Sequence, residues 1–387
     1  MKLSTVARLS IALLALLLVA PPVSFADEED SAGHVYVLNN NLAGSNSITV
    51  FGRAADGKLS QQGVVPIGGL GSVAAFFDGN QGSLIRTPDG SRLFAVDAGS
   101  DQISVIDAHD GKLSPTGIFS SGGAGPVSLT YRSGLLYVLN AANASVAAAN
   151  VAGFRVDEHG GLHPIAGATR PLSSAHPNPA QVQISPDGSQ LVVTEKSTNL
   201  IDIYQVASDG SLSVQPTSVS ATGVYPFGMA FDPTSRRELL VDDGFSGAVT
   251  AYQLNPNAQL QLVDGPVADH QIAPCWMVIT NNGHFAYTSN ADSQTISGYR
   301  IGHDGSITLL NANGATGTTP ADTFPIEESL SRNSRYLYVL DTRLLLPTGP
   351  GPATLSGFRI ENNGQLTPVV DPALINLPFS AIGQTAD

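Results

Sequence analysis

A turn motif that recurs seven times constrains the fold more than any other feature of this sequence. Most copies pair Asp or Asn with Gly, and nearly all follow a short run of alternating β-branched and aromatic residues. Such pairs tolerate the positive φ of tight hairpin turns, so each copy predicts a strand, a turn and a second strand. Successive copies lie 47 to 59 residues apart and begin at Asp56, Asp110, His159, Asp209, Asn257, Asp304 and Asn363.

A second series of turns precedes the first, and an apolar strand follows each of its members. The series is centred on Asp89, Ser133, Asp187, Thr234, Asn282 and Asn333. Two turns per repeat give a four-stranded antiparallel meander, which is the blade of a β-propeller. The first repeat, beginning at Gly33, lacks an innermost strand, while residues 378–383 form an unassigned segment at the end of the chain. We therefore predict an all-β, seven-bladed β-propeller of four-stranded antiparallel blades, closed by the C-terminal strand pairing in the first blade.

The first residues have the pattern of a secretory signal. Lys2 and Arg8 precede the apolar run Ile11–Ala20, and the small-residue pattern Ser24-Phe25-Ala26 follows. The run is shorter than the roughly 20 residues of a spanning helix, so we expect no membrane insertion. We predict a signal peptide at residues 1–26, a short acidic segment at 27–32 and a single propeller domain at 33–387. The protein is then exported, to the periplasm or the extracellular space.

Composition excludes several classes of function. The formal net charge of −14 disfavours nucleic acid as a partner. The single cysteine, Cys275, cannot form an internal disulfide. The sequence has no nucleophile elbow, no phosphate-binding loop and no paired-cysteine motif. Asp242 and Asp243 are neighbours in a strand, so their side chains point in opposite directions, which counts against both binding one metal ion. We expect a monomer with no cofactor and no bound metal.

Antiparallel blades separate their connections onto two faces. The repeated turns all lie on one face, here called the hairpin face, and the longer, dissimilar connections lie on the opposite loop face. Dissimilar loops on a repeated scaffold are where function is usually found, and those nearest the axis converge on a central funnel. The residues expected around this funnel are Asn39, Asp97, Tyr225, Asp242, Asp243, His270, Trp276, Asn290, Asp341 and Arg343.

One blade places three reactive side chains on the loop face. His176 precedes the innermost strand of the fourth blade, and Glu195 with Lys196 follows the next strand. We predict that His176 acts as a general base assisted by Glu195, and that Lys196 stabilises a developing oxyanion. The alternative is a solvated Glu-Lys pair and a histidine that only packs in its loop.

The repeats at residues 93–107 and 185–191 and the closing segment 377–383 resemble the seven-bladed lactonase propeller family. That family includes 6-phosphogluconolactonase-type enzymes and carboxymuconate cyclases. The resemblance implies a His-x-His pair, an Arg-His pair and a loop glutamate. Here His176 matches the first histidine, Asn178 replaces the second, and Tyr225-Pro226-Phe227-Gly228 stands where the Arg-His pair is expected. Asp242 and Asp243 replace the glutamate. The segment Tyr137-Val-Leu-Asn also resembles the YVTN repeats of secreted propellers.

Two functions follow from these observations. The first is hydrolysis of an unphosphorylated lactone by general-base attack of water in the funnel. A phosphorylated sugar lactone fits less well, because the expected anion-binding arginine is missing. The second is a non-catalytic exported propeller that binds a small molecule, a glycan or a protein partner through the same funnel.

Overall fold

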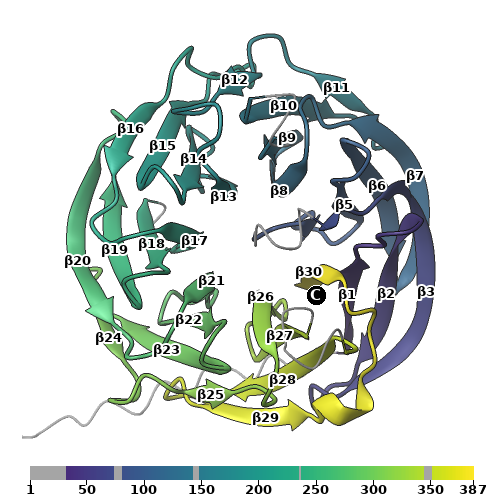
Figure 1. Cartoon of the computed structure of the whole chain (residues 1–387), viewed down its shortest axis with the longest axis vertical. Helices are drawn as coiled ribbons and strands as arrows, with labels where there is room; N and C mark the ends of the chain where they lie inside the picture. Colours follow the sequence, from purple (N-terminus) through teal and green to yellow (C-terminus); the bar gives the residue numbers. More distant parts are fainter. Residues whose placement is uncertain (1–31, 74–80, 143–147, 235–236, 344–350) are drawn as a thin grey trace, which may run out of the picture.

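The computed structural model describes residues 32–73, 81–142, 148–234, 237–343 and 351–387. Their strands form seven sheets arranged in a ring around one axis (Figure 1). Every pairing between consecutive strands of a sheet is antiparallel, and the predicted seven-bladed propeller is confirmed. The signal peptide and most of the acidic segment lie outside the described residues and stay predictions.

Each blade runs from an innermost strand at the axis to an outermost strand at the rim. Blade 1 contains β30 (Ala381–Ala386), β1 (Gly33–Asn39), β2 (Ser45–Arg53) and β3 (Leu59–Leu70). Blade 2 contains β4 (Leu84–Arg86), β5 (Arg92–Asp97), β6 (Gln102–His109) and β7 (Lys112–Ser120). Blade 3 contains β8 (Pro126–Arg132), β9 (Leu135–Asn140), β10 (Asn150–Val156) and β11 (Leu162–Pro164), with β12 (Arg170–Pro171) also pairing with β10.

The other four blades follow the same order. Blade 4 contains β13 (Pro179–Ile184), β14 (Gln190–Glu195), β15 (Leu200–Gln205) and β16 (Thr217–Ser220). Blade 5 contains β17 (Pro226–Phe231), β18 (Glu238–Asp243), β19 (Ala248–Leu254) and β20 (Leu260–Ala268). Blade 6 contains β21 (Pro274–Ile279), β22 (Phe285–Asn290), β23 (Thr295–Ile301) and β24 (Ile307–Leu309), with β25 (Gly317–Thr318) on β23. Blade 7 contains β26 (Phe324–Leu330), β27 (Tyr336–Thr342), β28 (Thr354–Ile360) and β29 (Leu366–Val370).

The last strand closes the ring. β30 pairs with β1 in antiparallel register, with Val35 opposite Ala386 and Leu38 opposite Gly383, so the first and last strands of the described chain share one blade (Figure 1). The strand begins three residues later than the predicted segment. Pro378 instead accepts a hydrogen bond from the amide of Ala381, so residues 378–380 form a turn that leads into the strand.

The core lies between neighbouring blades rather than at one centre. A single cluster of buried side chains includes Leu38 of blade 1, Phe94 of blade 2 and Val138 of blade 3. Each buried Leu or Phe of this kind contributes about 1.5–3 kcal/mol. Every blade therefore depends on both of its neighbours, which makes closure of the ring important for stability.

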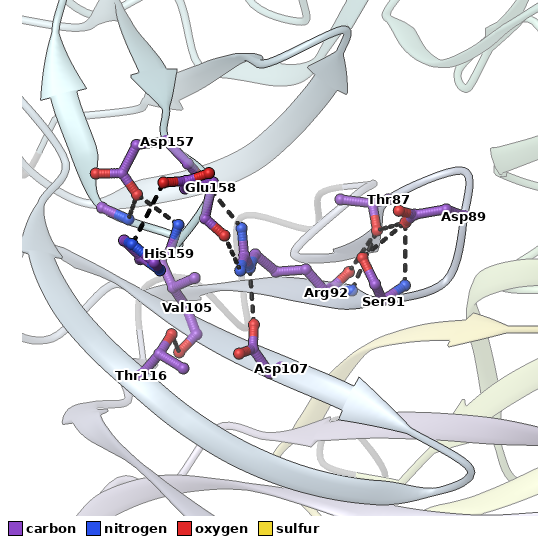
Figure 2. A network of polar contacts seen from close by, with 11 residues as sticks. Thr87, Asp89, Ser91, Arg92, Val105, Asp107, Thr116, Asp157, Glu158 and His159 are labelled. Atoms are coloured by element: carbon purple, nitrogen blue, oxygen red, sulfur yellow. Dashed lines mark hydrogen bonds and ion pairs between the residues drawn. The ribbon is translucent and has the colours of Figure 1, made fainter.

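The hairpin face repeats one turn chemistry. In the β4–β5 turn, one carboxylate oxygen of Asp89 accepts hydrogen bonds from the Ser91 amide (3.0 Å) and hydroxyl (2.9 Å) and from the Thr87 hydroxyl (2.5 Å), as Figure 2 shows. These bonds lower the pKa of Asp89 to about 2. Asp187 makes the equivalent bonds with Ser185 and Ser189 in blade 4.

Side chains also join neighbouring blades on this face. Arg92 of β5 donates to the carboxylate of Asp107 at 2.9 Å and to the carbonyls of Asp157 and Glu158, which lie in the outer turn of blade 3 (Figure 2). Tyr137 donates in the same way to the Gly210 carbonyl of blade 4 at 2.8 Å. The repetitive turns of the hairpin face thus act as clamps between blades.

Candidate functional site

Five of the ten residues expected around the funnel lie at or next to the end of the second strand of a blade, and they are buried. Each of the five bonds a polar side chain on the third strand of its own blade, so it pins two strands together instead of facing the axis. The pairs and their distances are Asn39 with Thr49 (2.9 Å), Asp97 with Ser104 (2.7 Å), Asp243 with Thr250 (2.5 Å), Asn290 with Ser297 (2.8 Å) and Asp341 with Ser356 (2.6 Å).

Burial changes the ionisation of the acids among these pins. It raises the pKa of Asp97 to about 6 and the pKa values of Asp243 and Asp341 to about 7, although the neighbouring hydroxyl opposes each rise. A carboxyl group hydrogen-bonded inside a blade is poorly placed to meet a ligand. These three residues are therefore explained by the architecture of the blade.

Blade 4 departs from this pattern at Glu195. Its carboxylate accepts hydrogen bonds from the amide (3.0 Å) and hydroxyl of Ser173 and from the hydroxyl of Thr198 at 2.6 Å. Its neighbour on the third strand is Asp202 instead of a hydroxyl residue, and burial together with the charge of Glu195 raises the pKa of Asp202 to about 7. Glu195 is thus engaged inside blade 4, whereas the side chain of His176 is exposed.

Lys196 points away from this network. Its side chain is only 2% exposed, and its ammonium lies 4.7 Å from the centre of the Phe227 ring in blade 5. Its amide donates to the Asn178 carbonyl at 3.1 Å, and the next amide, of Ser197, donates to the Pro177 carbonyl at 3.0 Å. The loop that carries Lys196 is therefore paired with the segment that follows His176.

Lys196 belongs to a cluster that we call the mouth, made of Lys196, Tyr225, Phe227, Cys275 and Trp276. The rings of Phe227 and Trp276 lie 5.1 Å apart, and Tyr225 lies 6.3 Å from Phe227. Cys275 packs in the same apolar cluster, and burial raises the pKa of its thiol. The structure therefore brings together three of the predicted site residues and adds Phe227 and Cys275, which sequence reasoning did not select.

One glutamine side chain below the mouth links the segment before blade 2 to blade 6. The side-chain amide of Gln81, on the segment before β4, reaches across to blade 6, where it donates to the Met277 carbonyl (2.6 Å) and accepts from the Met277 amide (3.0 Å). The Ser128 hydroxyl donates to the Gln81 carbonyl at 2.6 Å. A Cβ at Gly228 would lie 2.6 Å from the Cys275 carbonyl and 2.7 Å from the Gln81 side chain. The mouth therefore has a close-packed floor.

Three buried acids surround this floor. Burial raises the pKa of Asp242 and of Glu328, and the charge of Asp242 adds to the rise at Glu328. Glu327 accepts from the Gly82 amide at 2.9 Å, and burial raises its pKa to about 8. Sequence reasoning missed both glutamates, although an acid pair inside an innermost strand was a usable signal. Asp242 neighbours Thr288 of blade 6 while Asp243 bonds Thr250 in its own blade, so the two aspartates diverge as expected.

Two more predicted funnel residues, His270 and Arg343, also lie outside the mouth. His270 is exposed in the connection before β21, and Arg343 follows β27, where its charge partly opposes the rise that burial causes in the pKa of Asp341. Among the described residues, no group of three or more histidine, cysteine, aspartate or glutamate side chains is arranged to hold a metal ion. No helix in the described part of the chain is long and apolar enough to span a membrane.

A separate open cavity of about 640 Å³ lies on the hairpin face, at the ends of the innermost strands of blades 3 to 5. Six of its nine lining residues end innermost strands, three belong to the turns that follow, and none belongs to the mouth. The lining residues are Thr130, Tyr131, Arg132, Gln183, Ile184, Pro186, Asp187, Phe231 and Pro233.

Comparison with known proteins places this architecture in a family. The family model described as lactonase, 7-bladed beta-propeller, matches residues 36–268. The 6-phosphogluconolactonase of Pectobacterium atrosepticum is 29% identical over 146 residues, which is 35% of this chain and 42% of that protein. The chain thus matches less than half the length of this curated relative.

Solved structures show the same fold at low identity. The periplasmic gluconolactonase of Pseudomonas aeruginosa has a TM-score of 0.69 and 17% identity, with 92% of this chain and 99% of that one covered. A putative 6-phosphogluconolactonase of Bacteroides fragilis has a TM-score of 0.67 and 15% identity, with 93% and 99% covered. The family model spans more than half of the sequence, and the chain belongs to the lactonase family of seven-bladed β-propellers.

Proposed function

We propose that this protein hydrolyses a lactone that carries no phosphate, and that the reaction takes place at the mouth on the loop face. Membership of the lactonase family supports the reaction type. The observation that carries the proposal is the buried ammonium of Lys196, held against the ring of Phe227. A cation in an apolar setting interacts more strongly with a developing oxyanion than it does in water.

The charges around the mouth support an unphosphorylated substrate. The mouth holds one cationic side chain, Lys196, and no arginine, while Asp242, Glu327 and Glu328 lie buried around its floor. Bidentate recognition of phosphate usually relies on arginine. A doubly charged phosphate would meet one ammonium and, at alkaline pH, a growing negative charge beneath it. A neutral ring fits this arrangement better.

The proposed chemistry is attack of water on the lactone carbonyl. His176 accepts the proton of the attacking water, and the ammonium of Lys196 stabilises the oxyanion of the tetrahedral intermediate. The ring C–O bond then breaks, and the leaving alkoxide takes the proton from His176, which yields a hydroxy acid. Glu195 acts as a positioning residue, since its bonds to Ser173 and Thr198 fix the loop that carries Lys196.

Rates on matched lactones test this proposal. We expect wild type to hydrolyse glucono-δ-lactone with a higher kcat/KM than its phosphorylated form. Lys196→Met and His176→Gln should each lower kcat/KM by about 100-fold. Lys112→Met, an exposed residue of β7, is the matched control and should keep the wild-type rate. Equal rates for all four proteins, or a preference for the phosphorylated lactone, would contradict the proposal.

We also propose that the protein acts after export, with the propeller released from residues 1–26. The Lys2, Arg8 and Ile11–Ala20 pattern supports this, and a fold neighbour is named a periplasmic enzyme. Fractionation of an expressing bacterium, followed by intact mass of the exported protein, should give a chain that begins at Asp27. A cytoplasmic chain that retains Met1–Ala26 would overturn export while leaving the lactonase proposal intact.

A further inference from the structure

Three exposed apolar side chains lie on the loop face beside the mouth. The exposed fractions are 75% for Phe245, 62% for Ile272 and 53% for Val224. They come from three different connections of the loop face, those before β17, after β18 and before β21. With Tyr225 they form a surface that we call the ledge. Exposed apolar groups that gather in one patch often mark a binding surface.

The polar backbone of the ledge is satisfied within the protein. The Phe245 amide donates to the Val224 carbonyl at 3.2 Å, and the Val224 amide donates to the Ser246 hydroxyl at 2.9 Å. The Ile272 amide donates to the Ser293 hydroxyl at 2.7 Å. With these groups occupied, what the ledge presents to a ligand is chiefly apolar side chain.

Four aromatic rings in series connect the ledge to the mouth. Phe245 stacks on Tyr225 at 4.0 Å with an interplanar angle of 19°, and Tyr225 lies 6.3 Å from Phe227, which lies 5.1 Å from Trp276. The series runs from a ring that is 75% exposed to one that is 4% exposed. A ligand in the mouth would therefore contact the ledge through any substituent directed outward.

Tyr225 links the two regions in a strained conformation. Its φ is 69°, in the left-handed region that bulky side chains rarely adopt. The strain is held by a hydrogen bond from its amide to the Asn199 side chain (2.8 Å) and one from the Gly244 amide to its carbonyl (3.0 Å). Strained residues that the surrounding structure holds in place cluster at ligand-binding sites.

We propose that the ledge binds an apolar chain on the substrate, so that this protein prefers lactones with an alkyl or acyl substituent of several carbons. This inference rests on the proposed function only in placing the lactone ring in the mouth. The other exposed side chains of the ledge, Val224 and Ile272, are aliphatic. A sugar would need hydrogen-bonding side chains around the rings, so an apolar chain is the better match.

The single tryptophan, Trp276, gives a readout that does not require catalysis. Its fluorescence is titrated with γ-butyrolactam, which resembles a lactone but resists hydrolysis, and with the γ-pentyl derivative. We expect the pentyl lactam to bind wild type about tenfold more tightly or better, because each buried methylene strengthens binding. In Phe245→Ser and Ile272→Ser the ratio of the two dissociation constants should fall towards one. Val214→Ser, 69% exposed on blade 4, should keep the wild-type ratio.

The outcomes separate the two proposals. If pentyl lactam binds preferentially and Phe245→Ser abolishes the preference, but no lactone is hydrolysed, the ledge stands and the lactonase proposal fails. If lactones are hydrolysed with no dependence on chain length, the lactonase proposal stands and the ledge is overturned. If Phe245→Ser instead converts a dimer to a monomer in light scattering and leaves the ratio unchanged, the surface is a contact between chains, which also overturns the ledge.

Discussion

The hairpin face and the loop face are built by the same repeated unit, yet they vary in different ways. On the hairpin face the same side chains recur, as Asp89 and Asp187 show with their matching hydroxyl partners. On the loop face the residue after the second strand changes from blade to blade. In chain order that residue is Asn40, Ala98, Ala141, Lys196, Gly244, Ala291 and then Thr342 in blade 7, where the strand runs one residue longer.

The backbone of the loop face is nevertheless regular. Lys196, Gly244 and Ala291 each donate their amide to the residue before the proline that begins the innermost strand, at 2.9 to 3.1 Å. One fixed hydrogen bond therefore carries a variable side chain, and Lys196 is the single long cation among seven equivalent positions. The loop face thus repeats one backbone geometry in these blades while its side chains differ, which leaves them available for function.

Removal of β30, the strand that closes the ring, should have the largest effect on stability. Deletion of residues 381–387 strips β30 from β1, with the loss of buried Ile382 and of the two bonds that Gln384 donates to Glu327 and Tyr338. We expect unfolding to become easier by about 5 kcal/mol or more, because several buried hydrogen bonds and an edge of blade 1 are lost together. Urea denaturation followed by circular dichroism measures this.

Leu374→Ser is the matched control for the deletion, because this side chain is 81% exposed in the segment that precedes β30. It should leave the urea midpoint unchanged. A truncated chain that unfolds at the wild-type urea concentration would show that the blades are stable without closure, and the two faces would then be independent.

Loss of the contact between Gln81 and Met277 should have the next largest effect on stability. Gln81→Leu leaves the amide and carbonyl of Met277 without their partner across the axis. Buried polar groups that lose a partner cost about 1–3 kcal/mol each, so we expect a loss of roughly 2–4 kcal/mol in the free energy of unfolding. Gln261→Leu on the exposed edge of β20 should change it by less than about 0.5 kcal/mol. Equal stabilities would mean that Gln81 does not hold the floor.

The sequence predicted most of the fold because local chemistry repeats. Pairs such as Asp56-Gly57 and Asp304-Gly305 mark turns through their own backbone preferences, and the apolar runs between them alternate with the period of a strand. The missing innermost strand of blade 1 could be inferred by counting. Its exact start could not, because the turn at Pro378 depends on a hydrogen bond that only the folded chain makes.

The site was harder to predict, since side-chain direction decides it. Asp97 ends a second strand and Lys196 follows one, yet Asp97 turns into its blade to bond Ser104 while Lys196 reaches the neighbouring blade. Gln81 and Met277 are 196 residues apart, and no local pattern links them. Contacts across the axis depend on closure of the ring, so no short stretch of the sequence predicts them.

Asp202 of blade 4 should make stability depend on pH, as the buried acids Asp243 and Asp341 do in blades 5 and 7. Burial and Glu195 raise the pKa of Asp202 to about 7, so the folded chain holds a proton that the unfolded chain releases at lower pH. Stability from this group is present in acid and is lost as the pH rises towards 7. Asp202→Asn should flatten the slope of unfolding free energy between pH 5 and 7 by at most about 1.4 kcal/mol per pH unit, the value for one proton. Thermal unfolding at several pH values measures the slope, and an unaltered slope would contradict the shared burial of this pair.

The smallest expected effect on stability comes from Asp89, in a turn of the hairpin face. Asp89→Ala removes the bonds from Ser91 and Thr87 in one hairpin-face turn, which should lower stability by about 1 kcal/mol and leave lactone hydrolysis unchanged. Lys196→Met should instead act mainly on the reaction, with a fall in kcat/KM of about 100-fold. Parallel measurement of urea midpoints and rates decides the matter: if both substitutions change stability and activity together, the two faces do not divide structure from function.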